Sequence, residues 1–346
     1  MSMLACAKVA PEHNGLAVIE AEVRAPGPGE ILVRMSAAGI CGSDVSIYKW
    51  TPRYVDWVKL PRILGHEMSG VVVETGSGVS RVRTGDRISL DSHSACGQCH
   101  QCLTNRAHVC PNTRYPGIHI DGAFAEYVTV PEGIAWVNPP DAPEHLTAVL
   151  EPFGIAVHAT LEGMGVAGLD VVINGCGPIG LMNVGVARHF GARRVIGIDP
   201  NPLRRKAALA MGADRVLDPG GANVEAVVLD VTEQRGADVV FEYTGNPVGV
   251  VNAFKCLAVG GDLRWCATPP HPFEFNFGLL QKKRPTVYTL HGRRLWETWI
   301  KGAPLLYEKK IDLAPVLTHI LPLREAPRAF DLILSGQAGK PLLVPD

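Results

Sequence analysis

Apolar and polar positions change their pattern once along the chain, close to residue 155. Before that point, short apolar runs are separated by Gly and Pro, which is typical of a compact, barrel-like β domain. After Pro152, strand-like runs alternate with stretches of helical length, which predicts a parallel sheet covered on both faces. The first part is expected to form strands at 30–37, 68–74, 86–90 and 123–130. In the second part we expect strands at 170–174, 194–199, 215–217, 237–243, 262–267 and 286–290, with helices at 178–190, 202–211 and 224–235.

Length and charge narrow the class of protein. The chain has 346 residues, 47% of them hydrophobic, which is enough for two domains or two lobes of one enzyme. Its 33 Lys and Arg residues nearly balance its 34 Asp and Glu residues, and this excludes a general binder of nucleic acid. The longest charge-free apolar stretch, 171–187, is too short for a membrane span and is interrupted by glycine and proline. Residues 1–10 contain no segment of signal-peptide length, so we expect a cytoplasmic protein.

A glycine-rich run, Gly175-Cys176-Gly177-Pro178-Ile179-Gly180, lies between an expected strand and an expected helix. In this spacing the first glycine permits a tight turn, the second lets the backbone approach a pyrophosphate, and the third lets the helix pack on the strand. The helix N-terminus then offers N–H groups to the phosphates. Asp199 ends the next strand, where a carboxylate accepts a hydrogen bond from a ribose 2′-OH and repels a 2′-phosphate. The run therefore predicts NAD rather than NADP, although Arg204 and Arg205 lie just beyond Asp199.

Four of the nine cysteines lie close together in a polar loop. Cys96, Cys99, Cys102 and Cys110 have the spacing C-x2-C-x2-C-x7-C, which does not resemble a secreted disulfide framework. Four thiolates complete a tetrahedral shell, and a closed all-sulfur shell is typical of structural zinc. An iron–sulfur cluster and free cysteines are the alternatives, and zinc is favoured because little else in the chain indicates electron transfer.

A second group of metal-binding residue types is dispersed along the first part of the chain. Each member has a simple structural interpretation. Cys41 could be a buried thiol, His66 a core histidine, and Glu67 and Glu151 surface carboxylates. Together they offer sulfur, nitrogen and oxygen ligands, the mixed shell that leaves a coordination position open for chemistry. Their spacing alone leaves the catalytic and the structural interpretation equally open.

The order of these motifs points to a known family. Residues 38–44 (AGICGSD), 65–67 (GHE), the four-cysteine loop, 122–127 (GAFAEY) and the glycine-rich run follow one another. In this order the chain resembles the zinc-dependent medium-chain alcohol dehydrogenases over essentially its whole length. The resemblance implies an α/β protein with a GroES-like, β-rich catalytic domain at 1–155 that holds both zinc sites. It also implies a Rossmann-type, doubly wound parallel-sheet domain that binds NAD at 156–293, and a C-terminal segment at 294–346 that returns to the catalytic domain.

The resemblance further implies an NAD-dependent enzyme that oxidises a small secondary alcohol to a ketone and forms a homo-oligomer, a tetramer or a dimer. It assigns the catalytic zinc to Cys41, His66 and Glu67, with Glu151 joining or exchanging with the zinc-bound water. It assigns the relay hydroxyl to Ser43, and His93 matches a histidine near the substrate. The implied cofactor contacts are Ile179, Asp199, Arg204, Cys266, Ala267, Thr268, Leu290 and His291.

Further stretches, at 47–50, 91–93, 108–113 and 292–299, are similar to L-threonine 3-dehydrogenases. Those enzymes carry a proton-relaying histidine where this chain has Ser46, and a serine does not titrate near pH 7. Ser46 therefore marks either a changed relay or a reshaped pocket. The substrate hypotheses are L-threonine or a similar 2-amino-3-hydroxy compound, and a polyol, sugar or aminocyclitol. A non-catalytic NAD-binding protein is a distant alternative, because Cys41 and His66 are both present.

Overall fold

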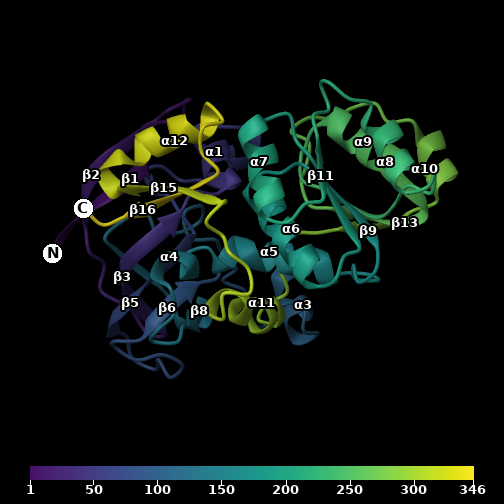
Figure 1. Ribbon diagram of the computed structural model, residues 1–346. Coiled ribbons are helices and arrows are strands. Elements are labelled where there is room, and N and C mark those ends of the chain that lie inside the picture. The colour runs from purple at the N-terminus through teal and green to yellow at the C-terminus, as the bar shows by residue number, and fades with distance from the viewer. The chain divides into compact units, whose positions relative to one another are not determined.

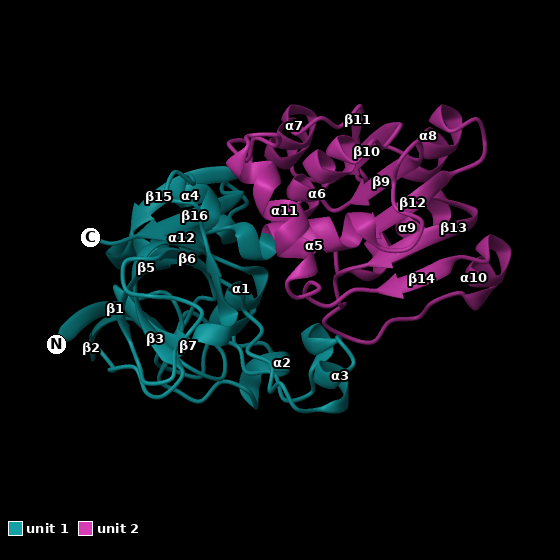
Figure 2. Cartoon of the chain, turned by 90° about the horizontal axis from the view of Figure 1, so that it is seen from below, with its two compact units in different colours: residues 1–152, 317–346 teal, residues 153–316 magenta.

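The computed structural model describes residues 1–346, which form two compact units. Unit 1 consists of Met1–Pro152 and Leu317–Asp346, and unit 2 of Phe153–Val316 (Figure 2). The second boundary lies later in the chain than the predicted 293/294, because helix α11 (Glu297–Tyr307) packs inside unit 2. Its Trp299 is buried, and its Gly302 lies against Phe153 and Val157. None of the helices combines the length and the apolar character that crossing a membrane requires.

Unit 1 is built from two sheets and a few short helices. Its small sheet has the strand order β2-β1-β4, and its larger sheet has the order β15-β16-β3-β5-β6-β8, with β7 paired to β3. The strands are β1 (Ser2–Lys8), β2 (Leu16–Glu22), β3 (Glu30–Gly39), β4 (Arg62–Ile63), β5 (Glu67–Thr75), β6 (Arg87–Leu90), β7 (Tyr127–Pro131), β8 (Ala135–Val137), β15 (Leu317–Pro322) and β16 (Lys340–Val344). The helices are α1 (Gly42–Tyr48), α2 (Pro52–Val55), α3 (His100–Leu103), α4 (Glu144–Thr147) and α12 (Ala326–Leu334), with single 3-10 turns at Ala107–Val109, Glu132–Ile134 and Leu323–Glu325.

The C-terminal residues complete the core of unit 1. Leu321, Phe330 and Leu343 belong to the same buried cluster as residues of β3 and β5. The ring of Phe330 stacks on Tyr48 of α1, with centroids 5.0 Å apart. The predicted strand 123–130 begins only at Tyr127, because the backbone of Phe124 bonds to Leu64 and Cys6 rather than to β3. The Phe124 ring packs on Gly65, where a Cβ atom would lie 2.3 Å from it.

Unit 2 contains a six-stranded parallel sheet with the order β11-β10-β9-β12-β13-β14, so the predicted doubly wound architecture is confirmed. Its strands are β9 (Asp170–Asn174), β10 (Arg194–Ile198), β11 (Arg215–Leu217), β12 (Ala237–Glu242), β13 (Leu257–Trp265) and β14 (Thr286–Thr289). Its helices include α5 (Leu150–Leu161), which begins at the end of unit 1, α6 (Pro178–His189), α7 (Pro202–Ala210), α8 (Val224–Val231), α9 (Pro247–Cys256) and α10 (Phe277–Lys283). In Figure 1, α6 and α7 lie on one side of the strands and α8, α9 and α10 on the other.

Two element boundaries in unit 2 differ by four or five residues from the sequence-based expectation, and the others by at most two. Helix α8 stops at Val231 rather than at 235, because Glu233 and Gln234 have φ angles of 54° and 65°, which a helix does not allow. Strand β13 starts at Leu257 rather than at 262, because Leu257 already pairs with Ala237 of β12. A bulge that contains Gly260, with a φ of 78°, separates this pair from the next one, Val239 with Asp262.

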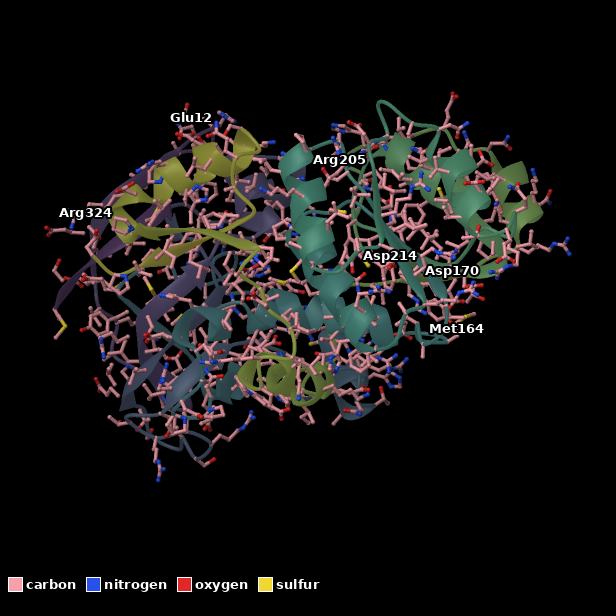
Figure 3. The ribbon with its side chains drawn as sticks, in the orientation of Figure 1. Glu12, Met164, Asp170, Arg205, Asp214 and Arg324 are labelled. Carbon is pink, nitrogen blue, oxygen red and sulfur yellow. The ribbon has the colours of Figure 1, made fainter.

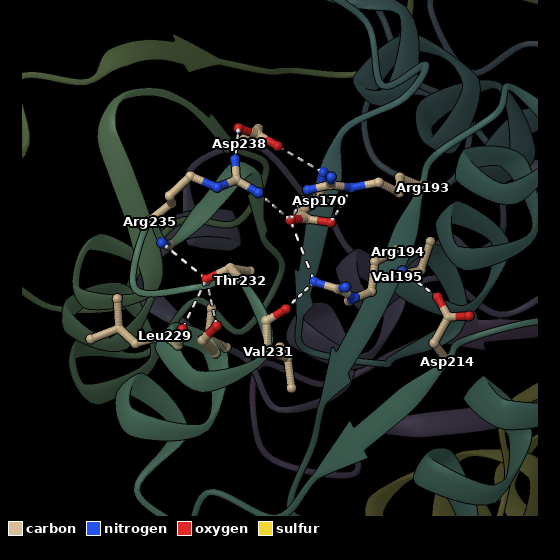
Figure 4. A network of polar contacts seen from close by, with 12 residues as sticks. Asp170, Arg193, Arg194, Val195, Asp214, Leu229, Val231, Thr232, Arg235 and Asp238 are labelled. Atoms are coloured by element: carbon tan, nitrogen blue, oxygen red, sulfur yellow. Dashed lines mark hydrogen bonds and ion pairs between the residues drawn. The ribbon is translucent and has the colours of Figure 1, made fainter.

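A buried carboxylate joins the amino ends of the parallel strands. Asp170, fully buried at the start of β9, accepts hydrogen bonds from Arg193 at 2.5 Å and from Arg235 at 3.3 Å (Figure 4). The guanidinium group of Arg194 is 3.5 Å away. Three cations thus neutralise one buried anion at the amino ends of the strands, whereas the glycine-rich loop lies at their carboxyl ends. We assign this cluster a role in stability.

Candidate active site

The predicted catalytic ligands Cys41, His66 and Glu67 come together in unit 1. Their ligand atoms, one sulfur, one nitrogen and one oxygen, all lie within 4.8 Å of one another. Cys41 caps the N-terminus of α1, and the His66–Glu67 pair stands where the chain enters β5. A zinc ion binds such donors at about 2.0–2.3 Å, so this mixed set fits a single ion.

Asp44, which the sequence motif contained without an assigned role, fixes two of these ligands. Its fully buried carboxylate accepts the N–H of Cys41 at 2.9 Å and the N–H of Gly65 at 3.3 Å. It also lies 3.7 Å from Nδ1 of His66. Burial lowers the pKa of His66, but Asp44 and Cys41 outweigh that effect and raise the pKa to about 10. Metal binding at His66 therefore has to release a proton.

Lys340 is the second residue that the sequence did not reveal. Its Nζ lies 2.7 Å from each carboxylate oxygen of Glu67 and 2.9 Å from the carbonyl oxygen of Ile40. Both partners of this ion pair are buried. Glu67 approaches β3 so closely that a Cβ atom on Gly39 would lie 2.3 Å from its Oε2, and a side chain there would displace this carboxylate oxygen. Lys340 follows Glu67 by 273 residues, and no spacing rule links them.

Glu151 lies beside this cluster but outside the group of three close ligand atoms. It is buried near the start of α5, and its charge raises the pKa of His66 and of Glu67. Burial is the main cause that raises the pKa of Glu67, and Lys340 opposes it. The structure thus places Glu151 next to the predicted metal ligands.

The other predicted catalytic residues have separate surroundings. Ser43 Oγ is 3.3 Å from Nε2 of His66, so its hydroxyl adjoins the ligand cluster. Ser46 Oγ donates to the carbonyl oxygen of Gly42 at 3.0 Å, one turn back on α1. His93 is buried, its backbone N–H donates to Asp91 at 2.7 Å, and its Nδ1 is 3.0 Å from Ser92 Oγ.

The four cysteines of the polar loop form a second cluster. Their sulfur atoms all lie within 4.8 Å of one another, and no disulfide joins them. The backbone N–H groups of Gln98 and Cys99 lower the pKa of Cys96 to about 6, which favours the thiolate that a metal requires. An all-sulfur tetrahedral shell fits these four positions.

The glycine-rich loop joins β9 to α6 in unit 2, as predicted. Gly175 has a φ of 100°, and a Cβ atom on Gly180 would lie 2.0 Å from the carbonyl oxygen of Gly175. Gly177 is the N-cap of α6, and a Cβ atom there would meet no protein atom within 4 Å. The backbone around Gly177 is therefore open to a ligand, which fits the expected approach of a pyrophosphate.

Asp199 directly follows β10, and both of its carboxylate oxygens accept hydrogen bonds from the backbone. They accept the N–H groups of Cys176 at 2.9 Å and Asn201 at 2.8 Å, and Nη1 of Arg204 is 3.7 Å away. Arg205, labelled in Figure 3, donates instead to the carbonyl oxygens of Asp199 and Pro200. Arg204, rather than Arg205, is thus the cation that faces the Asp199 carboxylate.

The remaining predicted cofactor contacts follow the carboxyl ends of two other parallel strands. Cys266, Ala267 and Thr268 come directly after β13, and Leu290 and His291 directly after β14. The N–H of Leu290 donates to the carbonyl oxygen of Trp265 at 2.9 Å, so the two segments leave the sheet side by side. Dinucleotides bind at the carboxyl ends of the strands of a doubly wound sheet.

Fold and site together define an α/β oxidoreductase of the zinc-binding type. Comparisons with known proteins agree, because the alcohol dehydrogenase GroES-like domain matches residues 27–140 and the zinc-binding dehydrogenase domain matches residues 178–308. The chain belongs to the zinc-dependent medium-chain alcohol dehydrogenase family and is an alcohol-oxidising dehydrogenase. The resemblance predicted from the motifs is thereby confirmed, and zinc and NAD are the metal and the cofactor of this chemistry.

Individual relatives cover the whole chain. It is 38% identical to the L-threonine 3-dehydrogenase of Thermococcus kodakarensis, over 99% of this chain and 98% of the relative. It is 40% identical to the L-threonine 3-dehydrogenase of Bacillus subtilis, over 91% of each chain. Among solved structures, galactitol-1-phosphate dehydrogenase from Escherichia coli has a TM-score of 0.91 at 26% identity and covers 99% of this chain and 100% of its own.

Proposed function

We propose that this dehydrogenase oxidises a small secondary alcohol to a ketone with NAD, using one catalytic and one structural zinc ion. The observation that carries the proposal is the presence of two donor clusters of different composition in unit 1. Cys41, His66 and Glu67, with Glu151 beside them, provide the mixed set that leaves a coordination position open. The four-cysteine cluster provides the closed set of a structural site.

When bound, zinc supplies a Lewis acid that makes the substrate hydroxyl more acidic, and NAD supplies the carbon that accepts the hydride. The Asp44 carboxylate lies 3.7 Å from Nδ1 of His66 and favours its protonated form, and Lys340 holds the Glu67 carboxylate in place. Ser43, whose Oγ adjoins His66, would accept the proton of the substrate hydroxyl and at the same time pass on its own. Ser46 cannot complete the route of the proton alone. Its hydroxyl donates to the carbonyl oxygen of Gly42 within α1, and a serine hydroxyl does not titrate near pH 7. Water or His93 carries the proton further.

Two groups of relatives support two different classes of substrate. The similarity to L-threonine 3-dehydrogenases supports L-threonine or a similar 2-amino-3-hydroxy compound. A polyol, sugar or aminocyclitol is the second candidate, supported by Ser46 and by the likeness to galactitol-1-phosphate dehydrogenase. A reshaped pocket predicts that Ser46→His raises the KM for the best substrate, whereas a missing relay predicts a higher rate near neutral pH.

NAD is proposed over NADP because of Asp199. A 2′-phosphate would have to lie beside a buried carboxylate, and the charge of Arg204 only partly offsets it.

A homo-oligomer in the cytoplasm is the proposed state of the enzyme. Strand β14 forms an edge of the six-stranded sheet, and its Val287 is 39% exposed. Such an edge pairs readily with the same strand of a second copy, giving a dimer or, with a further contact, a tetramer. Light scattering coupled to size-exclusion chromatography measures this state, and a monomer at micromolar concentration would contradict it.

The test of function is an NAD-reduction screen over threonine, sorbitol, inositols and amino sugars, combined with zinc analysis. We expect two zinc ions per chain, and one in an inactive Cys41→Ala variant. Cys256→Ala is the matched control, because Cys256 is buried in α9 outside both clusters. Full activity in a zinc-depleted Cys41→Ala variant would refute the catalytic site.

A further inference from the structure

The parallel sheet of unit 2 contains another fully buried carboxylate, at the carboxyl ends of the strands, whereas Asp170 lies at their amino ends. Glu242 is the last residue of β12 and is fully buried. It is in register with Asn174, the last residue of β9. Successive strands run outwards from these two, β10 and β11 on one side and β13 and β14 on the other. Glu242 therefore stands at the topological switch point, where doubly wound sheets bind their ligands.

No cation neutralises Glu242. Whereas three guanidinium groups surround Asp170, the partners of Glu242 are two backbone N–H groups, one hydroxyl and one amide. Burial raises the pKa of Glu242, and these hydrogen bonds oppose the rise. Burying a carboxylate without a counter-ion lowers the stability of the fold. We therefore expect a functional role for Glu242.

The hydrogen bonds of Glu242 shape one turn. Its Oε1 accepts the N–H of Thr244 at 2.8 Å, the N–H of Gly245 at 2.9 Å and the hydroxyl of Thr244. Its Oε2 accepts the side-chain amide of Asn174, which also donates to the carbonyl oxygen of Gly249 at 2.8 Å. One carboxylate thus ties the end of β9 to the turn at 243–246 and, through Asn174, to α9.

This turn lies between two segments that are predicted to contact the cofactor. On one side is Gly175 of the phosphate loop, where a Cβ atom would lie 3.0 Å from the backbone nitrogen of Thr244. On the other side are Ala267 and Thr268, because a Cβ atom on Gly245 would lie 3.3 Å from the carbonyl oxygen of Thr268. A shift of the turn by a few tenths of an ångström would therefore move both segments.

We propose that Glu242 is a positioning residue of the cofactor site, which sets the spacing between the phosphate loop and the segment 266–268 by holding the turn between them. This inference rests on the proposed NAD site. Glu242 does not touch the dinucleotide itself, because its side chain is fully covered by protein.

The test is Glu242→Gln, with NADH binding followed by fluorescence titration. The glutamine keeps the size of the side chain, but it brings an NH2 group against either Asn174 or the two turn N–H groups. We expect the Kd for NADH to rise about tenfold, from the loss of buried, charge-assisted hydrogen bonds. The KM for NAD is expected to rise with it, while kcat at saturating NAD changes less than twofold. A purely structural role would lower the melting temperature without this split.

Three further variants keep the test decisive. Asp170→Asn is the matched control, since it removes a buried carboxylate from the amino ends of the strands. It is expected to lower the melting temperature and to leave the Kd for NADH unchanged. If Glu242→Gln does not fold, Thr244→Val and Thr244→Ser replace it, and only the valine variant is expected to weaken NADH binding. A folded Glu242→Gln with wild-type Kd, or equal Kd values for the two Thr244 variants, would overturn the inference. Failure of the wild-type protein to bind NADH would instead overturn the proposed function, and this inference with it.

Discussion

Replacing Lys340 by methionine should destabilise unit 1 strongly, because it leaves the Glu67 carboxylate buried without its partner. At the observed separation of 2.7 Å, an effective dielectric constant of about 20 gives an attraction of about 6 kcal/mol. The desolvation of the two ions cancels much of this gain when both are present. Removing one ion keeps the desolvation cost of the other, and the expected loss of unfolding free energy is about 3–5 kcal/mol. For a domain of this size that corresponds to a fall in melting temperature of about 6–20 °C.

Calorimetry at a fixed free zinc concentration measures this loss, because bound zinc itself stabilises the folded state. Lys8→Met is the matched control in the same unit. Lys8 is also fully buried, but its Nζ donates to the carbonyl oxygens of Glu12 and Tyr48 and forms no salt bridge with a carboxylate. Its replacement leaves only neutral acceptors unpaired and is expected to cost about 1–3 kcal/mol.

The double variant Lys340→Met with Glu67→Gln identifies the cause of the loss. If the orphaned charge causes it, neutralising Glu67 recovers a large part of the stability, and the two substitutions are not additive. The reasoning is refuted if Lys340→Met costs no more than Lys8→Met, or if adding Glu67→Gln lowers the stability further by its own full cost.

Three further predictions concern the other sites. Cys102→Ala should lose one zinc ion per chain and lower the melting temperature, since structural zinc contributes to folding; an unchanged metal content by atomic emission would contradict it. Asp199→Ser should shift the ratio of the Kd values for NAD and NADP towards NADP by about tenfold, because the repelling carboxylate is gone and Arg204 remains; an unchanged ratio would show that Asp199 does not discriminate. Burial lowers the pKa of His158 below its ordinary value of 6.5, so the unfolded chain binds more protons, and stability falls as the pH drops through 6.5 towards the folded-state pKa. His158→Gln should remove that part of the pH dependence in thermal melts between pH 7.5 and 5, and a wild-type slope would contradict it.

The sequence predicts those features of this protein that local patterns determine. The glycine-rich loop and the strands around it are specified by residues close in the chain, and the structure has them at the expected positions. The donor atoms of Cys41, His66 and Glu67 lie together as the family resemblance implies, while their catalytic roles stay a prediction. The spacing between them did not show this closeness, because it depends on how β3 and β5 pair.

Features that depend on distant packing could not be predicted. Lys340 is one charged residue at the start of an apolar strand, and only the pairing of β16 with β3 brings it to Glu67. Glu242 ends a strand like many other acidic residues, and its role depends on the register of β12 with β9. The position of α11 within unit 2 is set by the burial of Trp299, which the loss of strand–helix alternation after 294 did not reveal.

The discontinuous make-up of unit 1 has a consequence for how the chain is made. Unit 2 is one continuous segment, 153–316, whereas unit 1 needs residues 317–346 to complete its larger sheet and its core. On the ribosome, the partner of Glu67 emerges only after the entire cofactor-binding unit has been synthesised. Since domains fold as units during synthesis, we expect unit 2 to fold first, which reverses the usual N-terminal-first order. The mixed donor cluster would then reach its final form last, and only full-length chains would carry a finished catalytic metal site.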